Sequence, residues 1–165
     1  MSATVRNETE IIVPEGLPII EIIREFEAPV DRLFRAYADP DLFVQWVGPR
    51  SIDSRVDVWD CSTGGRYRYV SSREGEEIAA FYGSFHEVRP DERIVQTFTY
   101  EGFPDGVALE IATFESLPAG RSRVHSVSVG ESVEGRDAMV ASGMSTGIIE
   151  GYEKLDELLG RGHGA

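Results

Sequence analysis

The chain has 165 residues, of which 29 are Asp or Glu and 16 are Lys or Arg, so its formal charge at neutral pH is −13. This length suits one domain, since a domain of about 150 residues buries roughly 70% of the surface that its unfolded chain exposes. The acidic balance argues against nucleic acid and anionic membranes as partners, because both attract clustered Lys and Arg. The single cysteine, Cys61, excludes an intramolecular disulfide and a cysteine-based zinc site.

The sequence shows no secretory signal at its start and no membrane-spanning stretch. Residues 1–16 lack the basic start and the continuous apolar stretch of a secretory signal. No run approaches the roughly 20 apolar residues that a membrane-spanning helix requires. We therefore expect a cytoplasmic protein with one domain over residues 1–165, a flexible N-terminal segment at 1–16 and a C-terminal tail at 160–165.

A strand and two short helices are predicted first. The isoleucine-rich stretch from Leu17 to Phe26 is typical of a strand, and it ends at Pro29. In "PVDRLFRAYADP" the apolar residues recur at helical spacing, and proline suits the first helical turn because its missing N–H would be unpaired there. A second helix, Pro40 to about Trp46, ends before Gly48-Pro49.

Six segments of alternating character follow, separated by short Gly, Pro and Asp clusters. They are Asp53–Trp59, Gly65–Ser71, Glu77–Val88, Arg93–Tyr100, Val107–Glu115 and Arg121–Glu131. Breaks of hairpin length favour antiparallel neighbours, because parallel strands need long crossover connections. The sequence therefore predicts an antiparallel meander.

The last predicted element is one long helix, from about Asp137 to Leu159, with an apolar stripe that strengthens toward its C-terminus. Its interior contains Gly143 and Gly147, and each helical glycine costs about 1 kcal/mol relative to alanine. These glycines would let a ligand or a strand approach the helix backbone, or they would serve close helix-to-sheet packing alone. Helices gathered on one face of an antiparallel sheet make an α+β arrangement.

The order of these elements resembles the helix-grip superfamily of START and Bet v 1-like proteins (SRPBCC), and within it the branch named after the activator of heat-shock-protein-90 ATPase. The matching pieces are "EFEAPVDRLFRAYADPDLFVQWVGP", "GGRYRYV", "FYGSFHEVRPDERIVQTF" and "EGYEKLDELL". The resemblance implies a seven-stranded antiparallel sheet wrapped around a long C-terminal helix, with two short helices after the first strand. The chain departs from many relatives at two positions. It has Val47 where they carry a second aromatic residue after the Trp, and Tyr152 where they often carry Trp in the last helix.

Aromatic and apolar residues on the strands and the last helix are candidates for lining a ligand chamber. The expected lining residues are Trp46, Tyr67, Tyr69, Phe81, Phe85, Gln96, Phe98, Tyr100, Ile111, Gly143, Met144 and Ile148. Ligand pockets combine such apolar walls with a few polar groups. The competing interpretation is a solid core, since protein interiors normally pack densely, and for Trp46 a structural role in the core is favoured.

No catalytic or metal-binding residue is assigned. His86, His125 and His163 lack metal-like spacing, and the sequence contains no hydrolase, metalloprotease, phosphate-binding or dinucleotide motif. Cavity acid–base chemistry would need Glu110, His86 or Arg68 on an inward face. Glu110 alternates with Leu109 and Ile111, which resemble a core-facing pair, so the pattern argues against it.

Three functions compete. The first is binding of a small hydrophobic or aromatic ligand without a cofactor, by a monomer or homodimer. The second is a cavity acid–base enzyme of the cyclase, dehydratase or hydrolase kind, which fold analogy alone supports. The third is a cochaperone-type activator of heat-shock-protein-90 ATPase. In the relatives of that name the activity also depends on a separate N-terminal domain, for which we expect no room in this chain.

Overall fold

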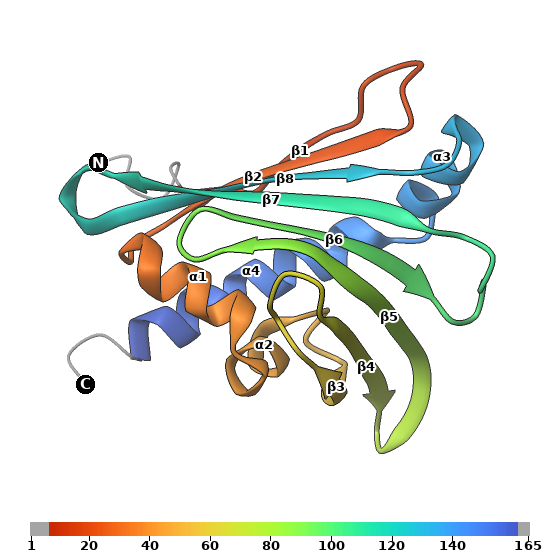
Figure 1. The fold of residues 1–165 in the computed structure, drawn as a ribbon, viewed down its shortest axis with the longest axis horizontal. Coiled ribbons are helices and arrows are strands. Elements are labelled where there is room, and N and C mark those ends of the chain that lie inside the picture. Colours follow the sequence, from red (N-terminus) through yellow and green to blue (C-terminus); the bar gives the residue numbers. More distant parts are fainter. Residues whose placement is uncertain (1–6, 162–165) are drawn as a thin grey trace.

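The computed structural model describes residues 7–161 and contains one antiparallel sheet with helices on one side of it (Figure 1). The strands are β1 (Glu10–Ile12), β2 (Ile19–Phe26), β3 (Asp53–Trp59), β4 (Arg66–Arg73), β5 (Glu76–Arg89), β6 (Arg93–Tyr100), β7 (Ala108–Leu117) and β8 (Arg121–Val129). The helices are α1 (Val30–Ala38), α2 (Pro40–Trp46), α3 (Val133–Ala141) and α4 (Met144–Arg161), with a 3-10 turn, η2, at Pro118–Gly120.

The strand order in the sheet is β1-β2-β8-β7-β6-β5-β4-β3, and every neighbouring pair is antiparallel. From β3 to β8 the chain forms a continuous meander, as the short turns predict. The connection through α1 and α2 carries the chain from β2 to the opposite edge of the sheet. The α+β helix-grip fold is therefore confirmed.

The structure differs from the sequence prediction at the N-terminal edge. The sheet has eight strands, not seven, because Glu10–Ile12 pairs with β2 inside the segment that was expected to be flexible. The apolar run Ile11-Ile12-Val13 was the available signal. A strand of three residues before a Pro and Gly turn is too short to stand out by alternation. Residues 1–6 lie outside the described part.

The predicted long helix is divided in two. Helix α3 ends at Ala141, and α4 begins at Met144 after Gly143, whose φ is +88°. This left-handed conformation favours glycine, because a Cβ atom there would crowd the backbone of an L-residue. Helix α4 also runs through Arg161, so only residues 162–165 of the expected tail lie outside the described chain.

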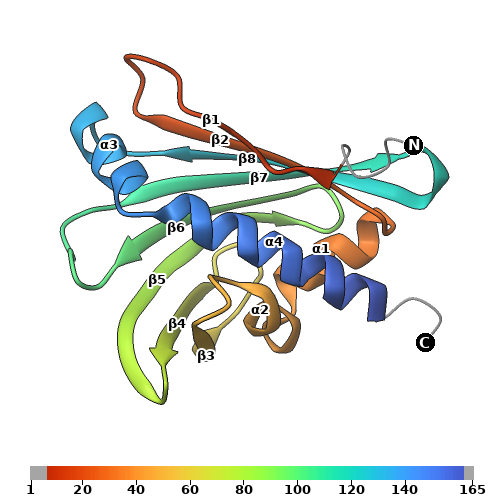
Figure 2. The same cartoon turned by 180° about the vertical axis from the view of Figure 1, so that it is seen from behind.

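Helix α4 crosses the concave side of the curved sheet, with α1 and α2 beside it at one end and α3 at the other (Figures 1 and 2). A partly buried ion pair ties α4 to the sheet: the Arg24 guanidinium donates to both carboxylate oxygens of Asp156, at 2.6 and 3.0 Å. Arg24 is only 3% exposed, so this contact satisfies a charge that would otherwise be costly to bury. The Tyr37 and Tyr152 hydroxyls, 2.9 Å apart, link α1 to α4.

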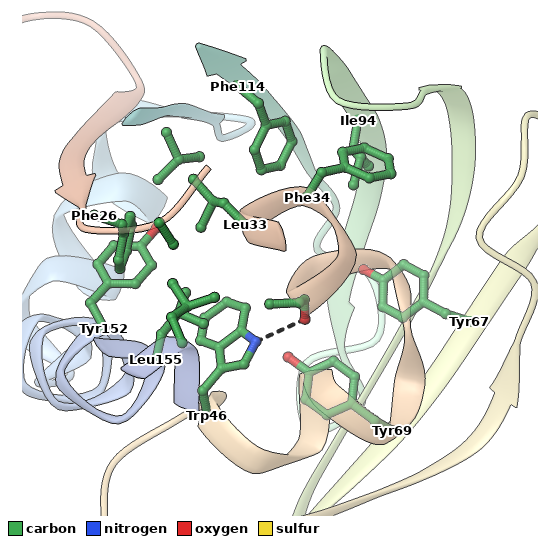
Figure 3. Packing of buried hydrophobic residues seen from close by; sticks show 14 of the residues in the cluster. Phe26, Leu33, Phe34, Trp46, Tyr67, Tyr69, Ile94, Phe114, Tyr152 and Leu155 are labelled. Carbon is green, nitrogen blue, oxygen red and sulfur yellow. Dashed lines mark hydrogen bonds between the residues drawn. The ribbon is translucent and has the colours of Figure 1, made fainter. Parts of the chain in front are cut away.

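Trp46 closes the corner between α2, α1 and α4. Its indole is 7% exposed and donates a hydrogen bond of 2.9 Å to the backbone oxygen of Ala36, drawn as a dashed line in Figure 3. The ring stacks on Tyr152, with centroids 5.9 Å apart, and also contacts Tyr37 and Phe43. The prediction that Trp46 is mostly buried is confirmed. The two short helices therefore supply the aromatic end of the core.

Candidate functional site

The inward face of the sheet is set by residues that contact the helices. On β7 the ring of Phe114 packs edge-on against Phe34 and Tyr37 of α1, with centroids 5.2 and 5.1 Å apart. Because successive side chains of a strand alternate between faces, Ala112 and Glu110 share the inward face with Phe114. The register pairs Glu110 with Gln96 of β6 and Ser128 of β8, so these side chains point inward too.

Most of the strand residues expected to line a chamber do lie on this concave face. They are Tyr67, Tyr69, Phe81, Phe85, Gln96, Phe98 and Tyr100. Ile111 does not, because it pairs with Val95 and Val127 in the opposite phase to Glu110. Ile111 therefore belongs to the outer face, and its place in the expected lining is wrong.

Aromatic rings form a continuous ladder across four strands of the concave face. Trp59 contacts Tyr67, and Tyr67 lies beside Tyr69, at centroid distances of 5.9 and 6.2 Å. Tyr69 contacts Phe81 at 5.1 Å, and Phe81 stacks on Phe98 at 5.2 Å with an interplanar angle of 23°. The ladder thus runs from β3 to β6 in the direction of the β6–β7 connection.

One end of this face is a packed core and the other is open. Trp46, Tyr67, Tyr69 and Phe85 are between 2% and 7% exposed, so near α1 and α2 the solid-core interpretation applies (Figure 3). Farther along the ladder Phe81 and Phe98 are partly exposed, and Tyr100 is 44% exposed. The aromatic surface therefore becomes accessible where it leaves the short helices.

The middle of the concave face is also accessible. Gln96, Glu110 and Ser128 lie on strands with neighbours on both sides, yet all three are partly exposed. Their partial exposure indicates that water reaches this part of the concave face. On β7 and β8 the inward neighbours of Glu110 are small: Ala108, Ala112, Ser126 and Ser128; on β6 they are the larger Ile94, Gln96 and Phe98. We refer to the part of the concave face around Glu110 as the central recess.

Helix α4 faces this recess with its first half. Ile148 packs against the core cluster, while Met144 is partly exposed at the start of the helix. Gly143 shapes the α3–α4 break, and a Cβ atom placed on it would meet nothing within 4 Å. Gly147 approaches Pro49, at 3.4 Å from a built Cβ atom. Neither glycine is therefore explained by close approach of a strand.

Glu110 is a candidate site residue that the alternation pattern of β7 placed on the wrong face. Its carboxylate accepts a hydrogen bond of 2.5 Å from the Ser128 hydroxyl, and desolvation by the surrounding side chains raises its pKa above the ordinary value. Leu109 and Ile111 resembled the core-facing pair because the outer face of the central strands is also apolar. A signal was nevertheless available, since Glu110 is in phase with the aromatic Phe114.

Three tyrosines from two elements lie close enough to Glu110 for its charge to affect their pKa values. Burial raises the pKa of Tyr67 and Tyr69 on β4 and of Tyr152 on α4, and the charge of Glu110 raises each further. Tyr67 also donates a hydrogen bond of 2.6 Å to the Thr97 carbonyl. These phenols are therefore neutral at physiological pH, whereas Glu110 is a carboxyl group with a raised pKa.

Other reactive side chains are separated from the recess. Arg68 lies outside with Glu101 and Asp57, His125 contacts Glu21 at 2.9 Å, and His86 is exposed. Burial and the charge of Asp60 raise the pKa of the Cys61 thiol to about 11, so the thiol is protonated at neutral pH. His163 lies outside the described residues.

Residues 7–161 contain neither a metal-binding cluster nor a helix that could span a membrane. No group of three or more His, Cys, Asp or Glu side chains in that range is placed to hold a metal ion. In the same range no helix combines the length and the apolar character needed to cross a membrane.

A shallow hollow lies on the outer face of the sheet. Its lining residues are Glu10, Ile23, Glu25, Thr113, Glu115, Arg123 and His125. Arg123 donates to Glu25 at 3.0 Å and to Glu115 at 2.8 Å, so most of its charged groups already have partners. The central recess is the better candidate site, because its carboxylate has no cationic partner among the described residues.

Comparison with known proteins identifies the relatives of the chain. The model of the family described as "Activator of Hsp90 ATPase homolog 1-like protein" matches residues 27–160. No curated protein is a significant match. Among solved structures, a protein from Rhodobacter sphaeroides is 25% identical with a TM-score of 0.84, covering 93% of this chain and 99% of its own. A Mycobacterium smegmatis protein is 26% identical with a TM-score of 0.81, covering 92% and 96%.

Proposed function

Since the chain belongs to the Activator of Hsp90 ATPase homolog 1-like family and has its helix-grip fold, we propose that it binds a small hydrophobic or aromatic molecule in the central recess. The ligand lies between the inward face of β6, β7 and β8 and the first half of α4. Phe98 and Ile148 supply apolar contacts, and Gln96, Glu110 and Ser128 supply the polar ones.

One observation carries this proposal: inward side chains on interior strands remain partly exposed. Gln96, Glu110 and Ser128 would be fully buried if α4 packed closely on the sheet. Helix α4 instead packs most closely on α2. The short inward side chains of β7 and β8, and the packing of α4 on α2, leave space for a ligand between α4 and the sheet. Apolar walls with a few convergent polar groups are typical of ligand pockets.

The test is a binding titration with a fluorescent aromatic probe such as anilinonaphthalene sulfonate. We expect saturable binding by the native protein and weakening by about tenfold or more in Ala112→Leu, which projects a larger side chain from β7 into the recess. Ala112→Leu should unfold near the parent midpoint if the recess is open, whereas overpacking a solid core costs about 1–3 kcal/mol. Absence of saturable binding in the parent would refute the proposal.

Thr113→Leu is the matched control, because Thr113 is the next residue of β7 and lines the outer hollow. It should leave probe binding unchanged. If Thr113→Leu abolishes binding and Ala112→Leu does not, the probe binds to the outer hollow and the recess is not the site.

A second candidate function is a cavity acid–base enzyme, which the inward position of Glu110 supports. A general acid or base works best when its pKa is moved toward the working pH, and desolvation acts in that direction on Glu110. On this alternative Glu110→Gln would abolish turnover of a bound substrate while leaving its binding intact. Ligand binding ranks first because it requires only the accessible surface, without a reactive substrate.

Two further parts of the proposal concern the cell. The family description names an activator of the Hsp90 ATPase, and cochaperone activity is the third candidate function for this chain. It would be tested by adding the protein to an Hsp90 ATPase assay. The ligand-binding proposal also includes a cytoplasmic location and a monomeric or homodimeric state. Gel filtration of the native protein tests the oligomeric state.

A further inference from the structure

We propose that the ligand of the central recess is an organic ammonium cation carrying an aromatic ring, whose charged nitrogen pairs with Glu110 and whose ring lies on the exposed end of the aromatic ladder. This inference rests on the proposed function and assigns a chemical class to its ligand. It follows from three features of the recess: a carboxylate without a counter-ion among the described residues, small neighbours on β7 and β8, and accessible aromatic rings beside it.

The charge environment of Glu110 differs from that of the other inward charges. Arg24, also on the inward face, is paired with Asp156. Glu110 accepts one hydrogen bond, from Ser128, and no cationic side chain within residues 7–161 forms an ion pair with it. A carboxylate that is partly removed from water without a counter-ion is costly, and a bound cation offsets that cost.

The neighbours of Glu110 on its own strand and on β8 have short side chains. Ala108 and Ala112 precede and follow it on the inward face of β7, and Ser126 and Ser128 lie on β8. A primary ammonium group carries three N–H donors. Glu110 and the oxygen atoms of Ser128 and Gln96 can accept them.

The aromatic ring of the ligand contacts the exposed end of the aromatic ladder. Phe98 lies diagonally from Glu110, since it pairs with Ala108 in the adjoining row, and it stacks on Phe81. Both rings are partly exposed, and Tyr100 is 44% exposed. Aromatic faces attract cations as well as aromatic rings, so this surface favours the same class of ligand.

The main rival is a neutral ligand that donates a hydrogen bond to Glu110. The two ligands differ in their pH dependence. The titratable groups facing Glu110 are Tyr67 and Tyr69 from β4 and Tyr152 from α4, and their raised pKa keeps them neutral. Beyond Tyr152 the charge of Arg24 is paired with Asp156. Cation binding should therefore strengthen as pH rises and Glu110 ionises, while neutral-ligand binding should not.

The test compares two probes of nearly equal shape, 1-naphthylmethylamine, which is cationic at neutral pH, and 1-naphthylmethanol, which is neutral. Calorimetric titration of the parent protein should give the amine an affinity about tenfold or more above that of the alcohol. In Glu110→Gln this preference should vanish, with alcohol binding unchanged. Glu115→Gln removes an equal charge from the outer face of β7 and should preserve the preference.

Each outcome is decisive. Equal affinity for the two probes in the parent, or a preference that survives in Glu110→Gln, overturns the cation proposal while leaving aromatic ligand binding in place. Loss of the preference in Glu115→Gln as well would assign it to the net charge of the protein and would also overturn the proposal. Failure of both probes to bind refutes the ligand class together with the proposed function.

Discussion

Gly151 of α4 lies directly against the backbone of Trp46 in α2: a Cβ atom built on Gly151 would be 3.0 Å from the Trp46 carbonyl oxygen. The amide nitrogen and oxygen of Gly48 would each lie 3.5 Å from the same atom. The two segments therefore approach backbone to backbone. This backbone contact with α2 therefore helps to fix the position of α4 over the sheet, together with its contacts to Arg24 and Phe26 of β2.

Gly151→Ala should destabilise the protein by about 1–3 kcal/mol, because the added methyl group overpacks a contact with backbone atoms that cannot move aside. Gly147→Ala is the matched control, since its Cβ atom would make ordinary contact with Pro49 at 3.4 Å. That variant should be neutral or up to about 1 kcal/mol more stable through helix propensity. Urea unfolding measures both, and equal effects would contradict the backbone contact.

Gly143→Ala should destabilise the protein by about 1–2 kcal/mol for a different reason. The φ of Gly143 is +88°, and left-handed backbone is costly for a residue with a Cβ atom. Contact with the rest of the protein contributes nothing, since no atom beyond the adjacent residues lies within 4 Å of the built Cβ. Gly143→Asn should cost less than Gly143→Ala, because asparagine tolerates this conformation better. Thermal unfolding of the two variants checks the order, and the reverse order would contradict it.

Trp46→Ala should cost about 3–5 kcal/mol in the free energy of unfolding, a large share of the 5–15 kcal/mol typical of a domain. The loss combines a cavity among Tyr37, Phe43 and Tyr152 with an unpaired carbonyl at Ala36. Trp46→Phe keeps much of the ring packing but removes the hydrogen bond, so it should cost less. A loss below about 1 kcal/mol for Trp46→Ala in denaturant titration would be incompatible with the packing in Figure 3.

Glu110 should make the stability of the protein fall as pH rises. Its folded-state pKa lies above the ordinary value of 4.5, so folding disfavours the ionised form. The destabilisation is absent below pH 4.5 and grows as pH rises through the folded-state pKa. Glu110→Gln should therefore be more stable than the parent at neutral pH and lose that advantage in acid.

Glu115→Gln controls for the loss of one charge, since Glu115 lies on the outer face and pairs with Arg123 at 2.8 Å. Exposed ion pairs contribute little, so this variant should not gain stability at neutral pH. Unfolding midpoints measured across the acid and neutral range check both variants. An advantage of Glu110→Gln that is constant with pH would contradict a raised pKa.

The position of Trp46 and the meander could be predicted from sequence because each depends on local rules. Short turns between β3 and β8 permit only antiparallel neighbours. A large aromatic residue at the end of a short amphipathic helix has a strong tendency to be buried. Strand β1 escaped prediction because three residues give too little alternation, and the α3–α4 break escaped because Gly143 is equally compatible with a continuous helix and with its end.

By itself the sequence determined the order of the elements, their antiparallel pairing and the two sets of residues that share each strand face, since all three follow from spacing along the chain. Only the tertiary structure decided which set faces inward. On β7 both sets contain apolar residues, with Ile111 beside Val95 and Val127 on the outer face and Phe114 beside α1 on the inner one. Alternation shows which residues share a strand face, but it does not show which face points toward the core. The inward position of Glu110 therefore depended on how α1 and α4 pack against the sheet.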